Sequence, residues 1–398
     1  MPQPWLQVVG LGEDGMAGLS PAARALVESA EVIIGGARHH ELSDKVTAER
    51  LSWPTPFDAM IETIRAQQGR RVVILVTGDP LWYSVGARIL KAIDPAEVAF
   101  HPQLSAFQWA ACRLGWSLAD LDTLTAHGRP PEQVLSFLQP GARLLILTKD
   151  HTTPDDLARL LTDRGYGPSR LIALGALGGP NESRLEATAE TWPGGAPDFH
   201  TLALECRLAP GAVALPRTGL PDEAFRHDGK MTKREARTLA LSKLAPQRKG
   251  LLWDVGAGCG SIGVEWMRAA RDAAAIAIEP RAERRALAAE NALALGAPRL
   301  EIIEGEAPGA LDGLPPPDAV FVGGGLSRET IAACRAALKP HGRLVAHAVT
   351  LEGEAVLIAA EAEFGGELTR IAIARAEPIG PYRGWRPMMP VTQWSLWT

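Results

Sequence analysis

The sequence contains little cysteine, and its four cysteines stand far apart along the chain. They are Cys112, Cys206, Cys259 and Cys334. Zinc sites and redox dithiols need closely spaced pairs, so this spacing argues against both and predicts free thiols in a reducing compartment. The neighbouring His39 and His40 do not restore a metal site, because adjacent residues on a regular element face different directions. We therefore expect no bound metal.

A block of charge of one sign is also missing. The 41 basic and 46 acidic side chains are interspersed and leave a formal net charge of −5. Without a basic cluster to neutralise a phosphate backbone, nucleic acid is not an expected partner. The first five residues lead directly into an apolar strand, without the regions of a signal peptide, and no apolar run is long enough to span a membrane. We expect a cytoplasmic protein that does not bind membranes.

The composition is that of an ordinary globular protein, but the chain is longer than one hydrophobic core usually serves. The chain has 398 residues, of which 46% are hydrophobic and 22% charged. This length predicts two domains of roughly 150 to 200 residues each. Strand-like and helix-like segments alternate in both halves, which predicts an α/β protein with largely parallel sheets.

The first half opens with a strand, a glycine-rich loop and a helix whose cap and first residue are Ser20 and Pro21. Further strands are expected at 72–76, 98–100, 143–148 and 201–206, with helices from Ser105 and from near Thr153. A stretch rich in proline, glycine and charge follows. We therefore place the first domain at 1–206, a linker at 207–226 and the second domain at 227–398.

The second half restarts with a helix over 232–244, a strand over 250–255, a glycine loop and a helix over 261–270. Thr232 and Glu235 have the spacing of a capping box at the first helix. Later strands are expected at 275–278, 300–303 and 318–322. The loop that follows the strand 250–255 reads Gly256-Ala257-Gly258-Cys259-Gly260.

This glycine loop predicts a ligand site, because glycine lets the backbone turn sharply and approach a ligand closely. The helix that follows presents free amides to an anion. A dinucleotide fingerprint would have glycine at position 261, where the chain has Ser261, so the spacing favours a methyltransferase loop. Glu279 ends the next strand and can accept hydrogen bonds from both ribose hydroxyls of an adenosyl group.

Two later corners add detail to this site. The Gly305–Pro308 segment follows the third strand, where a loop can cover an adenine ring. The fourth strand ends in Gly323-Gly324-Gly325 rather than in the polar-Pro-Pro-aromatic pattern of amino-group methyltransferases. An exocyclic amine is therefore not the expected methyl acceptor.

The first half has its own candidate site at three corners between strands and helices. The turn at Gly10 and Gly12 is a weak signal alone, but Gly78 and Asp79 follow another apolar strand and Ser105 begins a helix after a third. Glycine, an acid and a proline at a strand end allow the backbone to wrap around a small ligand. The three corners predict one ligand cleft.

Both halves carry motifs of known families. The first half resembles the tetrapyrrole methylase family of corrin biosynthesis, in the segments 9–12, 77–80 and 105–106. The second half resembles the precorrin methyltransferase and decarboxylase domain, in the segments 231–235, 253–263, 322–325 and 348–352. Fused in this order, the two are similar to the family of precorrin-6Y C(5,15)-methyltransferases (decarboxylating).

This resemblance implies a tetrapyrrole methylase fold followed by a Rossmann-like class I methyltransferase fold, with two sites for S-adenosylmethionine. It implies methylation of precorrin-6B at carbon 5 by the first domain. The second domain would methylate carbon 15 and remove the carboxyl group of the ring C acetate, giving precorrin-8 in cobalamin biosynthesis. The expected partner is a small-molecule tetrapyrrole, and the chain is expected to form a homo-oligomer.

The resemblance also assigns residues. The cofactor-binding set comprises Gly10, Gly12, Gly78, Asp79, Leu81 and Ser105 in the first domain, and Thr232, Gly256, Ala257, Gly258, Cys259, Gly260, Glu279 and Ala307 in the second. Lys230, Arg234 and His347 are candidates to hold or protonate the acetate. The sequence departs from the family pattern at Glu13-Asp14, where a Gly-Pro-Gly is common, and at His347, where asparagine is expected.

The residues alone are also compatible with other classes of function. A general small-molecule or RNA methyltransferase with an accessory first domain would carry the same glycine loop, although the lack of basic patches disfavours RNA. The spacing at Ser261 disfavours a nicotinamide oxidoreductase. A tetrapyrrole-sensing module without activity would need the same clefts, and only turnover separates it from an enzyme.

Overall fold

The computed structural model describes residues 4–398, and the chain divides into two compact units. Unit 1 runs up to Arg129 and resumes from Pro140 to Ala212, and unit 2 comprises Pro130–Gln139 and Val213–Thr398. The boundary between Ala212 and Val213 falls within the expected linker, and the short segment 130–139 is grouped with unit 2. Within residues 4–398, no helix combines the length and the apolar character needed to cross a membrane.

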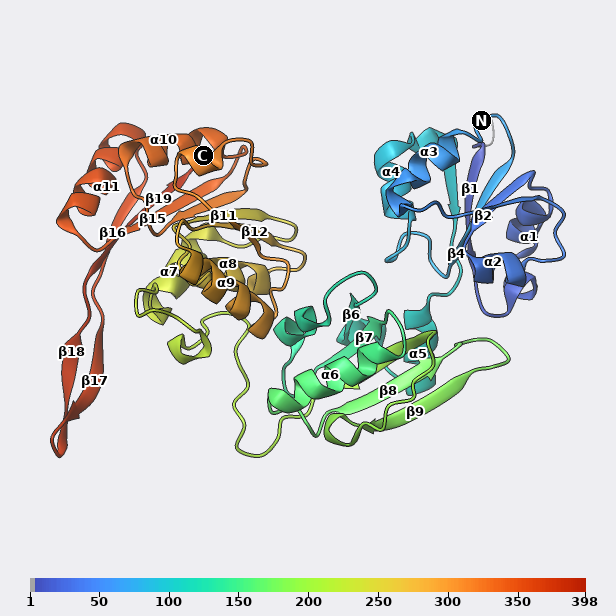
Figure 1. Cartoon of the computed structure of the whole chain (residues 1–398), viewed down its shortest axis with the longest axis horizontal. Coiled ribbons are helices and arrows are strands. Elements are labelled where there is room, and N and C mark those ends of the chain that lie inside the picture. Colours follow the sequence, from blue (N-terminus) through green and yellow to red (C-terminus); the bar gives the residue numbers. More distant parts are fainter. Residues whose placement is uncertain (1–3) are drawn as a thin grey trace. The chain divides into compact units, whose positions relative to one another are not determined.

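The first sheet of unit 1 is parallel throughout and has the order β3-β2-β4-β1-β5 (Figure 1). Its elements are β1 (Leu6–Leu11), α1 (Pro21–Glu28), β2 (Val32–Gly35), α2 (Ala37–Leu42), β3 (Glu49–Ser52), α3 (Met60–Arg65), β4 (Val72–Thr77), α4 (Gly86–Ala92) and β5 (Val98–His101). Every residue of β1 is buried, because α3 and α4 cover one face of the sheet and α1 covers the other.

The second sheet of unit 1 has the order β6-β7-β10-β8-β9. Its elements are α5 (Ala106–Leu114), β6 (Asp122–Thr125), β7 (Arg143–Leu147), α6 (Thr152–Asp163), β8 (Arg170–Gly175), β9 (Ser183–Thr188) and β10 (His200–Glu205). Strands β6 and β7 pair parallel, but the other pairs are antiparallel. The expected parallel sheet is therefore wrong here, because β8 and β9 follow one another without a crossover helix.

Unit 2 is built on a doubly wound sheet with the order β13-β12-β11-β14-β15-β19-β16 (Figure 1). Its strands are β11 (Leu251–Val255), β12 (Ala274–Ile278), β13 (Glu301–Ile303), β14 (Ala319–Val322), β15 (Arg343–Ala348), β16 (Glu367–Ile371) and β19 (Val391–Trp397). Its helices are α7 (Arg234–Leu244), α8 (Ser261–Ala269), α9 (Ala282–Ala294), α10 (Arg328–Ala337) and α11 (Leu351–Phe364). The strand order reverses between β11 and β14, and sheets of this kind bind ligands at such a point.

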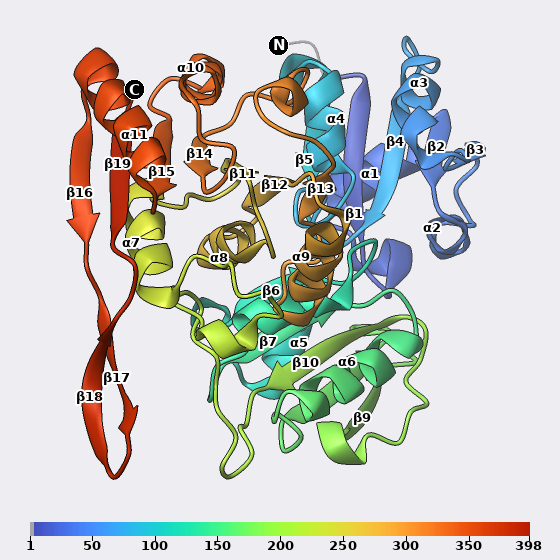
Figure 2. The same ribbon diagram turned by 60° about the vertical axis from the view of Figure 1, so that its left-hand side comes forward.

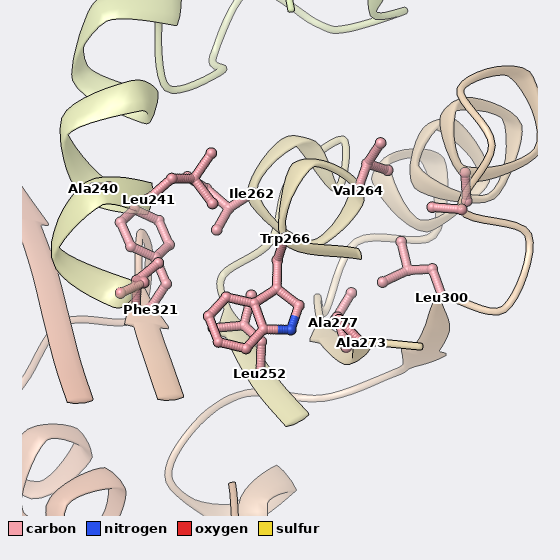
Figure 3. Packing of buried hydrophobic residues seen from close by; sticks show 14 of the residues in the cluster. Ala240, Leu241, Leu252, Ile262, Val264, Trp266, Ala273, Ala277, Leu300 and Phe321 are labelled. Carbon is pink, nitrogen blue, oxygen red and sulfur yellow. The ribbon is translucent and has the colours of Figure 1, made fainter. Parts of the chain in front are cut away.

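Helices α7, α8 and α9 pack on one face of this sheet, and α10 and α11 pack on the other (Figure 2). Figure 3 shows the first layer, in which Trp266 of α8 lies over Leu252 of β11 and beside Ile262. Trp266 is 1% exposed, and its indole nitrogen donates to the Gly250 carbonyl oxygen at 3.3 Å. This packing holds α8 against β11, and the glycine loop joins the two elements.

A two-stranded hairpin interrupts the sheet between β16 and β19. Its strands β17 (Ala374–Ile379) and β18 (Tyr382–Pro387) pair only with each other and project away from the sheet of unit 2 (Figure 2). Ile379, Tyr382 and Trp385 are exposed on this arm. The sequence did not indicate it, because its strands bury too little apolar surface to show a periodic pattern.

The helix starts test the capping predictions. Ser20 caps α1, with Pro21 as its first residue, and Ser105 caps α5 in a capping box with Gln108, so these predictions are confirmed. The capping box predicted between Thr232 and Glu235 is wrong. Helix α7 begins at Arg234, and its first amide donates instead to the Asp222 carboxylate at 2.9 Å.

Candidate functional site

The glycine loop of unit 2 lies between the carboxyl ends of β11, β12 and β14. Gly256, Gly258 and Gly260 have φ of 68°, 58° and 77°, a region that favours glycine. The Gly256 amide donates to the Ile278 carbonyl oxygen at 2.9 Å, which ties the loop to β12. A side chain on Gly256 would place its Cβ 2.5 Å from the Gly324 nitrogen. The loops after β11 and β14 therefore touch, as only glycine permits.

Glu279 directly follows β12 and is 2% exposed. Its Oε2 accepts from the Gly258 amide at 2.9 Å, and its Oε1 accepts from the Arg281 amide at 3.1 Å. A carboxylate offers about four acceptor positions, so two such bonds leave capacity for a ligand's hydroxyl groups. Glu279 thus orients the glycine loop and lies where the sequence predicts an adenosyl-binding acid.

Asp254 lies near the end of β11 and is 1% exposed. Its Oδ2 accepts from the Gly263 amide at 2.9 Å, which satisfies one of the free amides in the first turn of α8. Burial, together with the nearby Glu279 charge and against the Gly263 bond, raises the pKa of the Asp254 carboxyl to about 7. Asp254 joins the strand to the helix across the loop.

Cys259 belongs to the glycine loop but is buried. Burial raises the pKa of its thiol to about 11, so it stays protonated near neutral pH. Its carbonyl oxygen accepts from the Asn291 side-chain amide at 2.9 Å. The contribution of Cys259 is therefore through its backbone, and thiolate chemistry is not expected of it.

Ala307, beyond β13, is partly buried against the core beneath α10 and α11.

The segment before α7 lies beside this loop. The Lys230 carbonyl oxygen is 3.9 Å from the position that a Cβ on Gly258 would take. The Lys230 amide donates to Asp228 Oδ1 at 3.0 Å, and its side chain is exposed. The Thr232 carbonyl oxygen accepts from Arg237 at 2.7 Å. The structure thus places the Lys230 backbone near the glycine loop, with Thr232 two residues further on and the exposed Arg234 at the start of α7.

His347 has a different environment in β15. It is 9% exposed, its Nε2 lies 2.9 Å from Gln393 Oε1, and its ring meets that of Phe321 edge-on. Burial lowers the pKa of His347 to about 4, against the opposing effect of the Gln393 bond. The imidazole is therefore neutral near pH 7, with the Nε2 proton donated to Gln393. This environment favours a packing role over proton transfer to an acetate group.

The three predicted corners of unit 1 meet at the carboxyl edge of its first sheet. The Gly78 amide donates to the Leu11 carbonyl oxygen at 3.2 Å, and the Gln103 amide donates to the Gly78 carbonyl oxygen at 3.3 Å. A Cβ on Gly10 would come 2.8 Å from the Gln103 nitrogen, and one on Gly78 would come 2.8 Å from Ser105 Cα. The segments after β1, β4 and β5 are therefore packed backbone against backbone.

Other predicted residues of this corner shape its loops. Asp79 Oδ1 accepts from the Leu81 amide at 2.7 Å. The Leu81 side chain is 49% exposed. The Gly12 carbonyl oxygen accepts from the Gly15 amide at 3.0 Å. Glu13, one of the departures from the family pattern, forms an ion pair with Arg38 beyond β2. The unusual acid in the first loop thus has a cationic partner in the same unit.

A buried ionic network behind the unit 2 site escaped the sequence analysis. Arg237 of α7 and Glu265 of α8 are both 0% exposed, and Asp222 is 7% exposed. We call these three residues the Arg237 network. Asp222 falls in the segment 207–226, which the sequence predicts to be a linker. The available signal was an arginine and a glutamate on helix faces that otherwise carry apolar residues.

Parallel strands with glycine-rich turns at their carboxyl ends place the chain among α/β proteins of the nucleotide-binding type. Comparison with family models sharpens this class. Residues 6–193 match the tetrapyrrole (corrin/porphyrin) methylases, and residues 223–398 match the precorrin methyltransferase domain. The chain is 48% identical to a precorrin-6Y C(5,15)-methyltransferase [decarboxylating] of Sinorhizobium sp, over 99% of this chain and 96% of that protein. The chain belongs to this family, and the predicted fold class and family are confirmed.

Two shorter relatives each match less than half of the chain. A cobalt-precorrin-7 C(5)-methyltransferase of Salmonella typhimurium is 30% identical over 43% of this chain and 83% of its own length. A probable cobalt-precorrin-6B C(15)-methyltransferase (decarboxylating) of Pyrobaculum calidifontis is 39% identical over 44% of this chain and 92% of its own length. Activities at carbon 5 and at carbon 15 are thus named separately among the relatives.

Proposed function

We propose that this chain transfers two methyl groups from S-adenosylmethionine to precorrin-6B, at ring carbons 5 and 15, and decarboxylates the ring C acetate to give precorrin-8. The observation that carries this proposal is the 48% sequence identity, over 99% of the chain, to a relative of that name. The separate glycine corners of the two units support it, because methylation at two distant carbons can use two donor sites.

The donor site of unit 2 comprises the glycine loop, Glu279 and the segment 230–232. The residues fit the donor: Glu279 retains acceptor capacity for ribose hydroxyls, and a Cβ on Gly258 would meet nothing nearer than the Lys230 carbonyl oxygen at 3.9 Å, so the backbone there is open to close approach. Thr232 is two residues from Lys230, whose carbonyl oxygen lies beside the loop, and Ala307 follows β13 where an adenine ring would be covered. When bound, S-adenosylmethionine supplies an electrophilic methyl group, so alignment and exclusion of water account for much of the rate.

The donor site of unit 1 comprises Gly10, Gly12, Gly78 and Ser105, with Asp79 and Leu81 on the intervening loop. The close backbone packing of these corners and the exposed Leu81 support a ligand against the carboxyl edge of the sheet. We assign carbon 5 methylation to this domain, which ends near residue 206. Carbon 15 methylation and decarboxylation belong to the domain that begins near residue 227.

Decarboxylation needs the acetate held while the neighbouring ring accepts its electron pair. Lys230, whose carbonyl oxygen lies beside the glycine loop, and Arg234, at the start of α7, are exposed cations that suit a carboxylate. His347 is buried and bonded to Gln393, so we give the two cations the main part in holding the acetate.

The test is incubation of the protein with precorrin-6B and methyl-labelled S-adenosylmethionine, followed by mass analysis of the product. We expect two labelled methyl groups, the loss of one carboxyl group and released carbon dioxide. A product with one methyl group, or one that keeps all its carboxyl groups, would contradict the proposal. Binding of precorrin-6B without turnover would identify a sensing module instead.

We also propose that the chain forms a homo-oligomer through the β17–β18 hairpin. A two-stranded ribbon alone is marginally stable in water, yet this one exposes Ile379, Tyr382 and Trp385, which are 64%, 77% and 76% exposed. Ile379 and Tyr382 pair across the ribbon, and exposed apolar side chains of this kind are typical of a protein interface. A second copy of the chain can cover it by presenting the same surface.

Replacing Ile379, Tyr382 and Trp385 together by serine should weaken this association by at least about tenfold. Light scattering after size-exclusion chromatography measures the mass. The matched control is Leu293→Ser on α9, an apolar side chain that is 49% exposed and away from the hairpin. A monomeric parent protein, or an unchanged mass in the triple variant, would refute the interface.

A further inference from the structure

Arg237 is a fully buried arginine whose hydrogen bonds reach three parts of unit 2. Its Nε donates to Glu265 Oε1 on α8 at 2.6 Å, and its Nη1 donates to the Thr232 carbonyl oxygen at 2.7 Å. Its Nη2 donates to the Leu220 carbonyl oxygen at 2.5 Å. The guanidinium also lies 4.8 Å from the centroid of the Phe225 ring. One side chain thus joins α7, α8 and the segment that precedes α7.

The two acids of the Arg237 network extend these connections. Glu265 also accepts from the amides of Gly219 at 2.5 Å and Leu220 at 3.1 Å. Asp222 accepts from Arg237 Nη1 at 3.2 Å and from Arg375, at the base of the hairpin, at 3.1 Å. The segment 219–234 is therefore fixed to α8 through buried charges rather than through apolar packing alone.

This attachment bears on the donor site because α8 begins directly at the glycine loop. The segment held by Arg237 carries the Lys230 carbonyl oxygen to within 3.9 Å of a Cβ position on Gly258. A shift of the Thr232 carbonyl relative to α8 would open this contact. The distance between the segment 230–232 and the glycine loop thus depends on Arg237.

Stability alone does not account for such a network. Buried ion pairs are often no more stabilising than well-packed apolar side chains, because their desolvation offsets the attraction. The planar guanidinium, by contrast, can address several acceptors in fixed directions at once, which a lysine ammonium cannot reproduce. The arrangement suits a group whose task is to fix geometry.

We propose that Arg237 is a positioning residue for the methyl donor in unit 2. It holds the segment 230–232 against the glycine loop, so that Thr232 and Lys230 meet the donor and the acetate. This inference rests on the proposed function. Arg237 itself does not touch the reacting atoms.

Arg268, on α8 like Glu265, provides a matched control. It is 3% exposed, and its guanidinium donates to the carbonyl oxygens of Arg217 at 3.1 Å, Pro216 at 2.9 Å and Leu295. It therefore anchors the earlier part of the same segment, but its bonds reach neither 230–232 nor the glycine loop. Loss of the Arg268 guanidinium and its hydrogen bonds should destabilise the fold to a similar extent without moving Thr232.

The experiment compares Arg237→Lys with Arg268→Lys in the full chain, by calorimetric titration with S-adenosylmethionine. The parent protein should show two binding events, and the one that Glu279→Ala removes belongs to unit 2. Arg237→Lys should weaken this event by about tenfold and leave the other unchanged, whereas Arg268→Lys should leave both unchanged. In turnover, KM for S-adenosylmethionine, measured on carbon dioxide release, should rise while kcat at saturation stays near that of the parent.

Equal binding by Arg237→Lys and the parent, or equal weakening by both variants, would overturn the positioning role. If Arg237→Lys does not fold, the double variant R237M/E265M removes the buried Arg237–Glu265 pair, leaves Asp222 bonded to Arg375 and should keep the fold with the same weakened unit 2 event. Parent-like affinity in this variant would overturn the role as well. A parent protein that binds S-adenosylmethionine in unit 2 but does not convert precorrin-6B would instead refute the proposed function.

Discussion

Glu279→Ala is expected to abolish methylation at carbon 15 and the release of carbon dioxide, while methylation at carbon 5 continues. The variant loses the acceptor for the ribose hydroxyls and also frees the Gly258 amide that Glu279 holds at 2.9 Å. Hydrogen bonds to a charged group contribute about 1.5–3 kcal/mol each. Losing two to the donor therefore weakens its binding by about 3 kcal/mol or more, which is at least about a hundredfold.

The measurement is the mass of the product after incubation with labelled S-adenosylmethionine and precorrin-6B. The control is Glu304→Ala, because Glu304 follows the neighbouring strand β13 and its 74% exposed carboxylate pairs with Arg285. This control should retain both methylations. If Glu279→Ala removed both methylations, or neither, the assignment of one donor site to each unit would be wrong.

Gly256→Ala should inactivate the unit 2 site as completely as Glu279→Ala does. The residue has a φ of 68°, and its added Cβ would stand 2.5 Å from the Gly324 nitrogen. A left-handed conformation costs an alanine about 1–2 kcal/mol, and the clash must also push apart the loops after β11 and β14. Because both loops border the donor, we expect loss of carbon 15 methylation together with a lower melting temperature.

Gly313→Ala separates the two costs. Gly313 has a φ of 77°, but nothing lies within 4 Å of its would-be Cβ. This control should carry only the backbone strain and keep both methylations. Thermal unfolding and product analysis of the two variants measure the comparison. Equal behaviour would mean that the contact between Gly256 and Gly324 has no part in the site.

Much of each site could be predicted because its requirements are local. The positive φ of Gly256 and Gly258 demands glycine at these positions, so the loop is visible in the residues themselves. Glu279 could be assigned because parallel strands present their carboxyl ends at one edge, and the end of an apolar run marks that edge. The cap at Ser105 was predictable for the same reason, since a capping box spans only a few residues.

The errors came from residues whose partners are distant in the chain. The amide at the start of α7 is satisfied by Asp222, 12 residues away, and the expected partner Glu235 pairs instead with Arg375. His347 stays a predicted candidate to hold or protonate the acetate, and the sequence did not indicate that β19 brings Gln393 against it in the buried sheet. The pairing direction of β8, β9 and β10 also depends on how the chain returns, which no local period encodes.

The sequence by itself therefore determined the α/β class and the family, and it predicted a glycine-rich site in each half, because close backbone approach and strand ends leave their mark in the order of residues. Only the tertiary structure decided that Arg237, Glu265 and Asp222 form one buried network, that the hairpin stands free of the sheet, and that Thr232 is held by its carbonyl oxygen rather than capping a helix. These features depend on long-range contacts, and the burial of a charge is defined by what the rest of the chain places around it.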